Sequence, residues 1–139
     1  MLNPKLKNDW IEEATIRQIQ EKLETGVLTS KELVLIYLDR ISVFDKEIHS
    51  ILEVNPDALQ IAAGLDAERK EKGPRGPLHG IPILIKDNID TFDKMHTSAG
   101  SLALKNSFAL KDSFVAKQLR RAGAVILGKT NMTEWANFM

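Results

Sequence analysis

The sequence contains 139 residues, which is within the usual length of a single domain. Hydrophobic residues make up 43% of the chain and charged residues 27%, a composition typical of a soluble globular protein and not of a disordered one. Lysine plus arginine and aspartate plus glutamate each number 19, so no net charge attracts the chain to nucleic acid or to an anionic membrane. We therefore expect neither of those partners.

Further classes are excluded by residues and segments that the sequence lacks. Because the chain has no cysteine, disulfides, thiolate catalysis and cysteine-ligated metals are excluded. No uncharged run reaches the roughly 18 residues of a membrane span, and the first residues lack the apolar core of a secretory signal. His49, His79 and His96 do not have metal-ligand spacing. We therefore expect a cytoplasmic protein without a metal or other cofactor.

Two amphipathic helices are predicted at the start of the chain. Asp9 and Glu12 have capping-box spacing, and apolar residues then recur on one helical face as far as Gly26. Thr29 and Glu32 repeat the capping-box spacing ahead of a second apolar stripe. The two helices are predicted to form a hairpin.

A short strand and a third helix follow the hairpin. The strand is predicted over residues 51–54, after which Asn55 and Pro56 are well suited to begin a helix. This third helix is expected to end at about Lys72. The helical start of the chain therefore spans about 9–72.

The second part of the chain, about 73–139, has a different pattern. Three glycines and two prolines in residues 73–80 prevent a helix and indicate turns or extended backbone. Residues 81–85 are predicted to form a buried strand. Residues 124–127 form a second, fully apolar run, and its lack of alternation indicates burial on both faces, as in a parallel sheet covered by helices.

Two more helices are predicted around the second of these strands. One covers residues 112–121 and ends at Gly123, and the other begins at the capping-box spacing of Asn131 and Glu134. The expected fold class is therefore α/β, with a helical hairpin followed by strands of a mixed, largely parallel sheet covered by helices. No linker or repeat divides the chain, so we expect residues 1–139 to belong to one domain.

Lys86 is the main candidate for chemistry. It ends the apolar strand at residues 81–85, where rigid backbone and partial desolvation favour the neutral amine that a general base needs. The alternative is a lysine that extends from the strand end into solvent. Periodicity alone does not decide between these two interpretations.

The sequence around Lys86 resembles the amidase signature family. The segment GPLHGIPILIKDNID at residues 76–90 is similar to the part of that family that carries its catalytic lysine. The similarity continues in the same order with TSAGS at 97–101 and AGAVILGKTNMTEWA at 122–136. The resemblance covers essentially the whole chain and implies the amino-terminal part of an amidase-signature fold.

The resemblance implies a Ser-cisSer-Lys triad, in which one serine attacks the amide carbonyl and the bridging cis-serine passes its proton towards the lysine. Lys86 matches the lysine, but the chain contains no Gly-Gly-Ser-Ser run that would match the two serines. By the same resemblance, Ser98, Gly100 and Ser101 line or support the substrate site without being nucleophiles. We therefore expect this chain to be inactive by itself.

Several functions remain open. The first is the amino-terminal portion, by truncation, of a carbon–nitrogen hydrolase that acts on small amides or peptide amides. A second is the amidase subunit of the glutamyl-tRNA(Gln) amidotransferase type, although Thr133-Glu134-Trp135-Ala136 departs from the Asp-Glu-Phe-Ala pattern usual there. A third is a non-catalytic module that complements a second, carboxy-terminal chain. A fourth, in which Lys86 works with a local serine, is least favoured.

Incompleteness would also have a physical consequence. A sheet that lacks strands and covering helices exposes an apolar face and an unpaired edge. We therefore predict self-association of the isolated chain.

Other polar residues near Lys86 are assigned structural roles. Asp87 should point away from Lys86, because neighbouring strand residues face opposite sides, and it is expected to cap local backbone. Asp90 and Asp93 are expected to be solvated. Lys129 follows Gly128 as in a phosphate-binding loop, but the apolar strand before it replaces the flexible backbone that such a loop needs.

Overall fold

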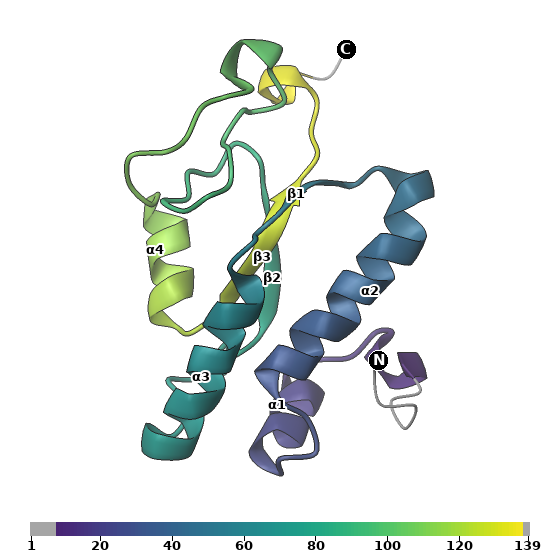
Figure 1. Cartoon of the computed structure of the whole chain (residues 1–139), viewed down its shortest axis with the longest axis vertical. Helices are drawn as coiled ribbons and strands as arrows, with labels where there is room; N and C mark the ends of the chain where they lie inside the picture. Colours follow the sequence, from purple (N-terminus) through teal and green to yellow (C-terminus); the bar gives the residue numbers. More distant parts are fainter. Residues whose placement is uncertain (1–7, 138–139) are drawn as a thin grey trace.

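The structure is a computed structural model, and it describes residues 8–137 (Figure 1). Four α-helices, three strands and three short 3-10 helices follow one another along these residues. In chain order they are η1 (Asn8–Ile11), α1 (Ile16–Glu24), α2 (Ser30–Ile48), β1 (Ile51–Val54), α3 (Ala58–Lys72), β2 (Pro82–Lys86), η2 (Leu102–Leu104), α4 (Phe114–Arg121), β3 (Val125–Thr130) and η3 (Glu134–Ala136).

The three strands form one mixed sheet in the order β1-β3-β2. The central strand, β3, pairs antiparallel with β1 and parallel with β2. Its first five residues are all buried, as the absence of alternation predicted. The α/β class and the mixed sheet are thus confirmed.

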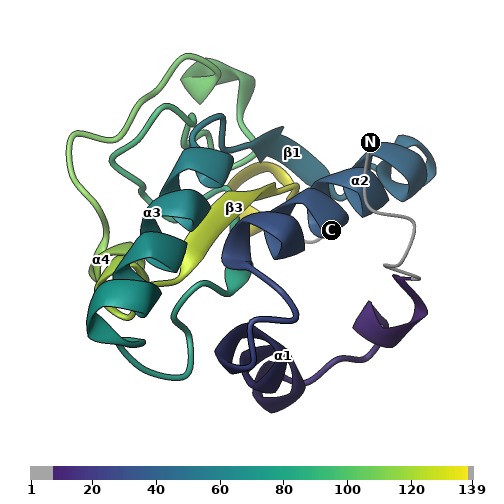
Figure 2. The same ribbon diagram turned by 60° about the horizontal axis from the view of Figure 1, so that its bottom comes forward.

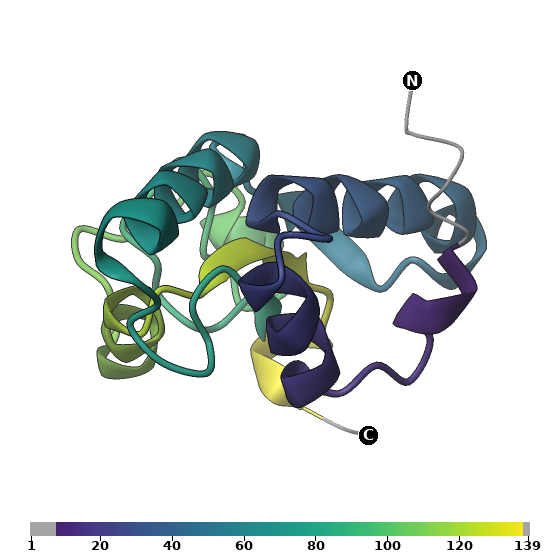
Figure 3. The ribbon, with the colours of Figure 1, turned by 90° about the horizontal axis from the view of Figure 1, so that it is seen from below.

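Helices cover β3 from both sides (Figure 3). Val125 and Leu127 pack against α2 and α3, whereas Ile126 packs with Ile85 against Ala116 of α4. Figure 3 shows α2 and α3 side by side in one layer, with α4 on the opposite side of the strands. Alternate residues of β3 therefore serve two separate cores.

A β-bulge interrupts the pairing of β2 with β3. Ile83 lies opposite Ile126, but the next residue, Leu84, lies opposite Gly128, so Leu127 is an extra residue on β3. Beyond the bulge, Ile85 is paired with Lys129. The bulge therefore sets which β3 residue accompanies each residue at the carboxyl end of β2.

The predicted helical start is confirmed in most of its parts. Helices α1 and α2 are consecutive and contribute to one apolar cluster with Ile81, and α2 also packs along α3 (Figure 2). The strand at 51–54 and the end of the third helix at Lys72 are as predicted. Within residues 8–137, no helix has the length and apolar character needed to cross a bilayer.

The predicted cap of α2 is confirmed, but that of α1 is wrong. Thr29 Oγ1 accepts a hydrogen bond from the Glu32 amide at 3.1 Å, and the Thr29 amide donates to the Glu32 carboxylate at 2.8 Å. Helix α1 instead begins after Thr15, which forms its capping box with Gln18. Glu13 has a φ of 56°, and this left-handed residue separates α1 from the short η1 helix.

The helix predicted from Asn131 and Glu134 is also wrong in the described residues. Only the three-residue η3 forms there, and Trp135 within it has a φ of 55°. The Asn131 side chain bonds the carbonyl of His49 at 3.1 Å, while Glu134 accepts a hydrogen bond from Ser101. Both candidate capping side chains are thus engaged with other parts of the chain.

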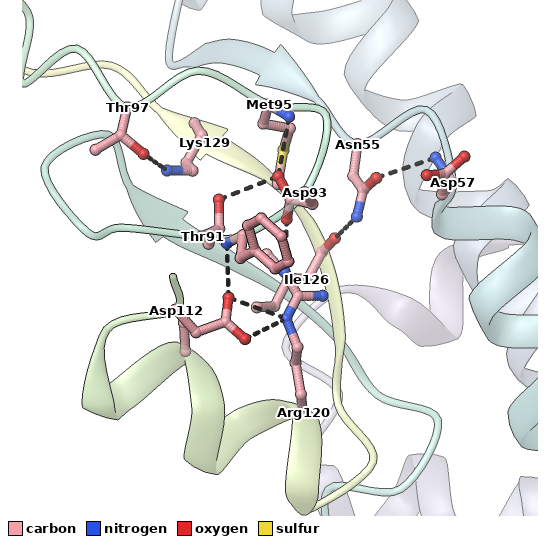
Figure 4. Close-up of polar contacts among 12 residues, drawn as sticks. Asn55, Asp57, Thr91, Asp93, Met95, Thr97, Asp112, Arg120, Ile126 and Lys129 are labelled. Carbon is pink, nitrogen blue, oxygen red and sulfur yellow. Dashed lines mark hydrogen bonds and ion pairs between the residues drawn. The ribbon is translucent and has the colours of Figure 1, made fainter. Parts of the chain in front are cut away.

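Asn55 connects α3 to the central strand (Figure 4). Its side-chain amide donates to the carbonyl of Ile126 at 2.8 Å, and its side-chain oxygen accepts from the amide of Asp57 at 3.0 Å. The N-cap of α3 is Asp57, and Asn55 binds the backbone amide of that residue from two positions earlier in the chain.

The glycine-rich turn before β2 is built around His79. This ring is fully buried, with Nε2 2.9 Å from the carbonyl oxygen of Leu65 and Nδ1 accepting from the amide of Arg75 at 3.3 Å. Gly123 lies against the ring, and a Cβ on Gly123 would be 2.8 Å from His79 Nδ1. The turn and the start of β3 therefore pack without room for a side chain.

We expect Gly123→Ala to destabilise the fold by about 1–3 kcal/mol, because the new methyl group meets His79 and the residue has a left-handed φ of 80°. Urea denaturation measures the free energy of unfolding directly.

Gly64→Ala is the matched control. Gly64 lies within α3, and a methyl group at this position would meet no atom within 4 Å apart from the neighbouring backbone of its own helix. Alanine should stabilise this helix by about 0.5–1 kcal/mol. Equal effects of the two substitutions would refute the close packing of Gly123 on His79.

Candidate functional site

Lys86 is the last residue of β2, and its side chain is exposed. By strand alternation it lies on the same face as Pro82 and Leu84. Those two residues line a groove of about 550 Å³ between the sheet and α2. Among residues 8–137, no hydrogen-bond or ion-pair partner is found for the Lys86 ammonium group. Within the described residues Lys86 is therefore not desolvated as expected, and its side chain extends into solvent from the end of a rigid strand, on the face that carries the groove.

The groove itself is mainly apolar. Helix α2 and the three strands supply its apolar lining, which consists of Tyr37, Ile41, Phe44, Ile48, Ile51, Pro82, Leu84 and Leu127. Several of these side chains are large and incompletely covered, with Phe44 at 51% and Ile48 at 66% exposure. Although α2 and α3 cover β3 on this face, the apolar surface along the groove is therefore only partly covered.

Asp87 points away from Lys86, as predicted, and is buried. One carboxylate oxygen, Oδ2, accepts hydrogen bonds from the amides of Ser98 and Gly100, each at 3.2 Å, and from the Ser98 hydroxyl. The second oxygen has no protein partner among the described residues. Asp87 therefore ties the turn at 98–100 to the end of β2.

Ser98, Gly100 and Ser101 lie in that turn, and both hydroxyls are engaged. Ser98 donates to Asp87, and Ser101 donates to Glu134 Oε1 at 2.6 Å. These three turn residues line a second cavity, of about 410 Å³, whose lining does not include Lys86. The structure therefore brings the predicted serines together with each other but not into contact with the predicted base.

The second cavity also contains a histidine–carboxylate pair that the sequence did not indicate. Glu53 of β1 accepts from the backbone amide of His96 at 2.8 Å and lies 3.1 Å from His96 Nδ1. The ring of Phe108 stacks at 4.2 Å from that of His96. Within residues 8–137, no group of three or more His, Cys, Asp or Glu side chains is placed to hold a metal ion.

Lys129 is a further polar residue whose burial was not predicted from the sequence. It is fully buried, and its Nζ donates to the carbonyl of Ile89 at 2.7 Å and to the Thr97 hydroxyl at 3.0 Å (Figure 4). Burial lowers the pKa of Lys129, while Asp87 and other nearby acids oppose that change. The sequence feature that could have indicated this burial is the position of Lys129, which continues a strand predicted to be buried on both faces.

Asp93 was predicted to be solvated, and this is wrong. It forms an ion pair with Arg120 of α4 at 2.6 Å, and Arg120 also binds Asp112 at 3.1 Å (Figure 4). Asp112 in turn accepts from the amide of Phe92 at 2.7 Å. The loop after β2 is therefore fixed to α4, although Asp90 is exposed as predicted.

The comparison with known families agrees with this arrangement of segments. A family model described as Amidase matches residues 32–139. The chain belongs to the amidase family. The match includes the whole sheet, Lys86 and the loop that follows it.

Individual relatives support the assignment. Proteins of Schizosaccharomyces pombe and Arabidopsis thaliana that carry the word amidase in their names are 50% and 48% identical over 96% and 92% of this chain. A glutamyl-tRNA(Gln) amidotransferase subunit from Salinispora arenicola is 40% identical over 80% of it. The chain spans 23%, 25% and 23% of the lengths of these three proteins, respectively.

Solved structures of the family have the same fold. The native peptide amidase of Stenotrophomonas maltophilia superposes with a TM-score of 0.86 at 48% identity, over 90% of this chain and 26% of its own. An amidase family protein from Bacillus anthracis gives a TM-score of 0.89 at 40% identity, over 94% of this chain and 26% of its own. This amidase-family chain thus corresponds to about a quarter of each relative.

Lys129→Met should change how the stability of the chain depends on pH. In the folded chain, burial holds the pKa of Lys129 below its ordinary value of 10.5, whereas the unfolded chain titrates near that value. Between the two values the unfolded state binds more protons, so this residue makes the free energy of unfolding rise with pH. The difference in that free energy, wild type minus Lys129→Met, should increase as pH approaches 10.5. Urea denaturation at several pH values measures it, and a flat or falling difference would contradict the lowered pKa.

Proposed function

We propose that this chain supplies the lysine of an amide-hydrolase active site, as the amino-terminal portion of a single amidase domain that includes residues 1–139. The observation that carries the proposal is the position of Lys86. It lies in the segment that resembles the catalytic-lysine region of the family, and it is exposed at the end of a strand that pairs in parallel with the buried central strand.

In the proposed reaction, the side-chain nitrogen of Lys86 is the final acceptor of a proton. A nucleophilic serine attacks the amide carbonyl, its proton passes to a bridging cis-serine, and the bridging serine gives a proton to Lys86. Departure of the amine requires a proton, which returns along the same route. No segment of the 139 residues matches the two serines, so we propose that the chain is inactive by itself.

A minimal hydrolase built from Lys86 and a local serine is disfavoured by the hydrogen bonds of the turn. The hydroxyl protons of Ser98 and Ser101 are donated to Asp87 and Glu134. A serine nucleophile must instead lie within hydrogen-bond reach of its base. We assign Ser98, Gly100 and Ser101 to the support of the site.

The substrate that we propose for the complete enzyme is a small amide or a peptide amide. The 48% identity with a peptide amidase supports this choice. The 40% identity with an amidotransferase subunit keeps the amidotransferase type as the second candidate. At position 135, this chain has Trp where the amidotransferase subunit usually has Phe.

We also propose that the groove, which Pro82 and Leu84 line on the same strand as Lys86, receives the rest of the amidase core, either from a carboxy-terminal segment or from a complementing chain. Its apolar lining supports this, because large exposed apolar surfaces mark interaction sites. We propose further that the protein is cytoplasmic and has no nucleic-acid partner, and the balanced charge supports the second of these points.

Ammonia release from a peptide amide tests the catalytic proposal. The purified chain should release none alone and should release it when mixed with a polypeptide comprising the serine-bearing remainder of a related peptide amidase. Lys86→Met should reduce that turnover by at least about 100-fold, the usual contribution of a general base. Lys117→Met, on the exposed face of α4, is the control and should leave it unchanged. Full turnover by Lys86→Met would remove Lys86 from the mechanism.

Self-association of the isolated chain should depend on the groove. Leu84→Asp places a charge on its lining and should shift the chain towards monomer in sedimentation velocity, because a buried unpaired charge weakens an apolar interface. Val27→Asp is the control, since Val27 is 69% exposed and lies outside the groove. Equal sensitivity to both substitutions, or a wild-type chain that is monomeric at all concentrations, would argue against association through this face.

A further inference from the structure

Two lysines lie at the carboxyl ends of neighbouring strands in opposite surroundings. Lys86 of β2 is paired with Thr130, while Lys129 of β3 is paired with Ile85. Lys86 is exposed on the face with the groove, and Lys129 is fully buried beneath the loop that follows β2. The proposed function uses only the first of these amines.

The partners of Lys129 lie near the two ends of that loop. Ile89 accepts from Lys129 Nζ at 2.7 Å, and the amide of Ile89 donates to the carbonyl of Lys86 at 3.0 Å. Thr97 accepts at 3.0 Å and directly precedes Ser98. One ammonium group therefore joins the turn that leaves Lys86 to the start of the Ser98–Ser101 turn.

Other side chains hold other parts of the loop. Asp87 holds residues 98–100, and Glu53 of β1 binds the backbone amide of His96. Arg120 holds Asp93 in the middle of the loop (Figure 4). None of these contacts joins Ile89 to Thr97, as the Lys129 ammonium does. The Ile89 carbonyl and the Thr97 hydroxyl both lie against the buried amine. An apolar residue in place of Lys129 would avoid the desolvation of an ammonium but would leave both acceptors without this donor.

We propose that Lys129 is a positioning residue for the amidase site: its buried ammonium holds the 89–97 loop on the central strand and so fixes both the turn after Lys86 and the turn at Ser98–Ser101. The relevance to catalysis rests on the proposed function, in which Lys86 is the base. The positioning itself is a property of the folded chain and is measurable without turnover.

Hydrogen exchange of backbone amides tests the proposal. In Lys129→Met, amides in residues 87–101 should exchange at least about tenfold faster than in the wild type, while those of α2 and α3 keep their relative protection. Lys86→Met is the matched control, with the same substitution on the neighbouring strand, and should leave exchange in the loop unchanged. Unchanged exchange in Lys129→Met, or a uniform rise over the whole chain, would overturn the positioning role.

A milder variant keeps the test decisive if Lys129→Met does not fold. Thr97→Val removes one acceptor of the Lys129 ammonium while preserving the shape of the side chain. Exchange should then rise at residues 97–101 by a smaller factor. No local rise in this variant would count against the proposal.

The absence of cysteine permits a chemical rescue. In Lys129→Cys, alkylation of the unfolded chain with 2-bromoethylamine modifies only this position and rebuilds a lysine-like side chain with sulfur in place of Cγ. After refolding, protection of residues 87–101 should return to the wild-type level. Alkylation with 1-bromopropane gives a side chain of equal length without the amine and should not restore it. Equal rescue by both reagents would show that packing alone is required, which overturns the proposal.

The outcomes separate this inference from the proposed function. If Lys86→Met retains full complemented turnover, the catalytic proposal fails while the exchange results for Lys129 stand. If the loop is indifferent to Lys129 but Lys86→Met abolishes turnover, the positioning role fails alone.

Discussion

The burial of β3 on both faces is the constraint on which the arrangement of the chain depends. Helices α2 and α3 cover one face, α4 and the loop after β2 cover the other, and β1 and β2 occupy its edges. The strands approach closely at Gly128, where a Cβ would be 2.5 Å from the carbonyl oxygen of Glu53. A central strand of this kind accepts polar side chains only where other segments supply their partners.

Those partners come from the loop after β2, which carries the residues assigned to the site. Lys129 reaches the loop from β3, Asp87 bonds its last turn, and Arg120 fixes its middle through Asp93. The loop has no strand or α-helix of its own, so side-chain bonds replace the usual backbone ladder. The same side-chain hydrogen bonds and ion pairs therefore both order the loop and provide partners for these buried charges.

The sequence predicted those features whose determinants are local. Apolar runs located the strands, and Thr29 with Glu32 located the start of α2, because both signals act within a few residues. The start of α1 was missed because Thr15 and Gln18, three positions apart like Asp9 and Glu12, form the capping box, and Glu13 ahead of them has a left-handed backbone. The Lys86 segment was recognisable as a motif. The burial of Lys129 and Asp93 was not, since it depends on residues up to 40 positions away.

Residues on the two sides of the sheet are expected to vary differently among related proteins. On the loop side, the buried ammonium of Lys129 binds acceptors within this chain, so Lys129 and Thr97 are expected to change together. On the groove side, Leu84 and Phe44 have no such partners, and their shape is free to follow whatever surface covers them. Amidases with different substrates can therefore keep the residues on the loop side of the sheet while the residues on the groove side change.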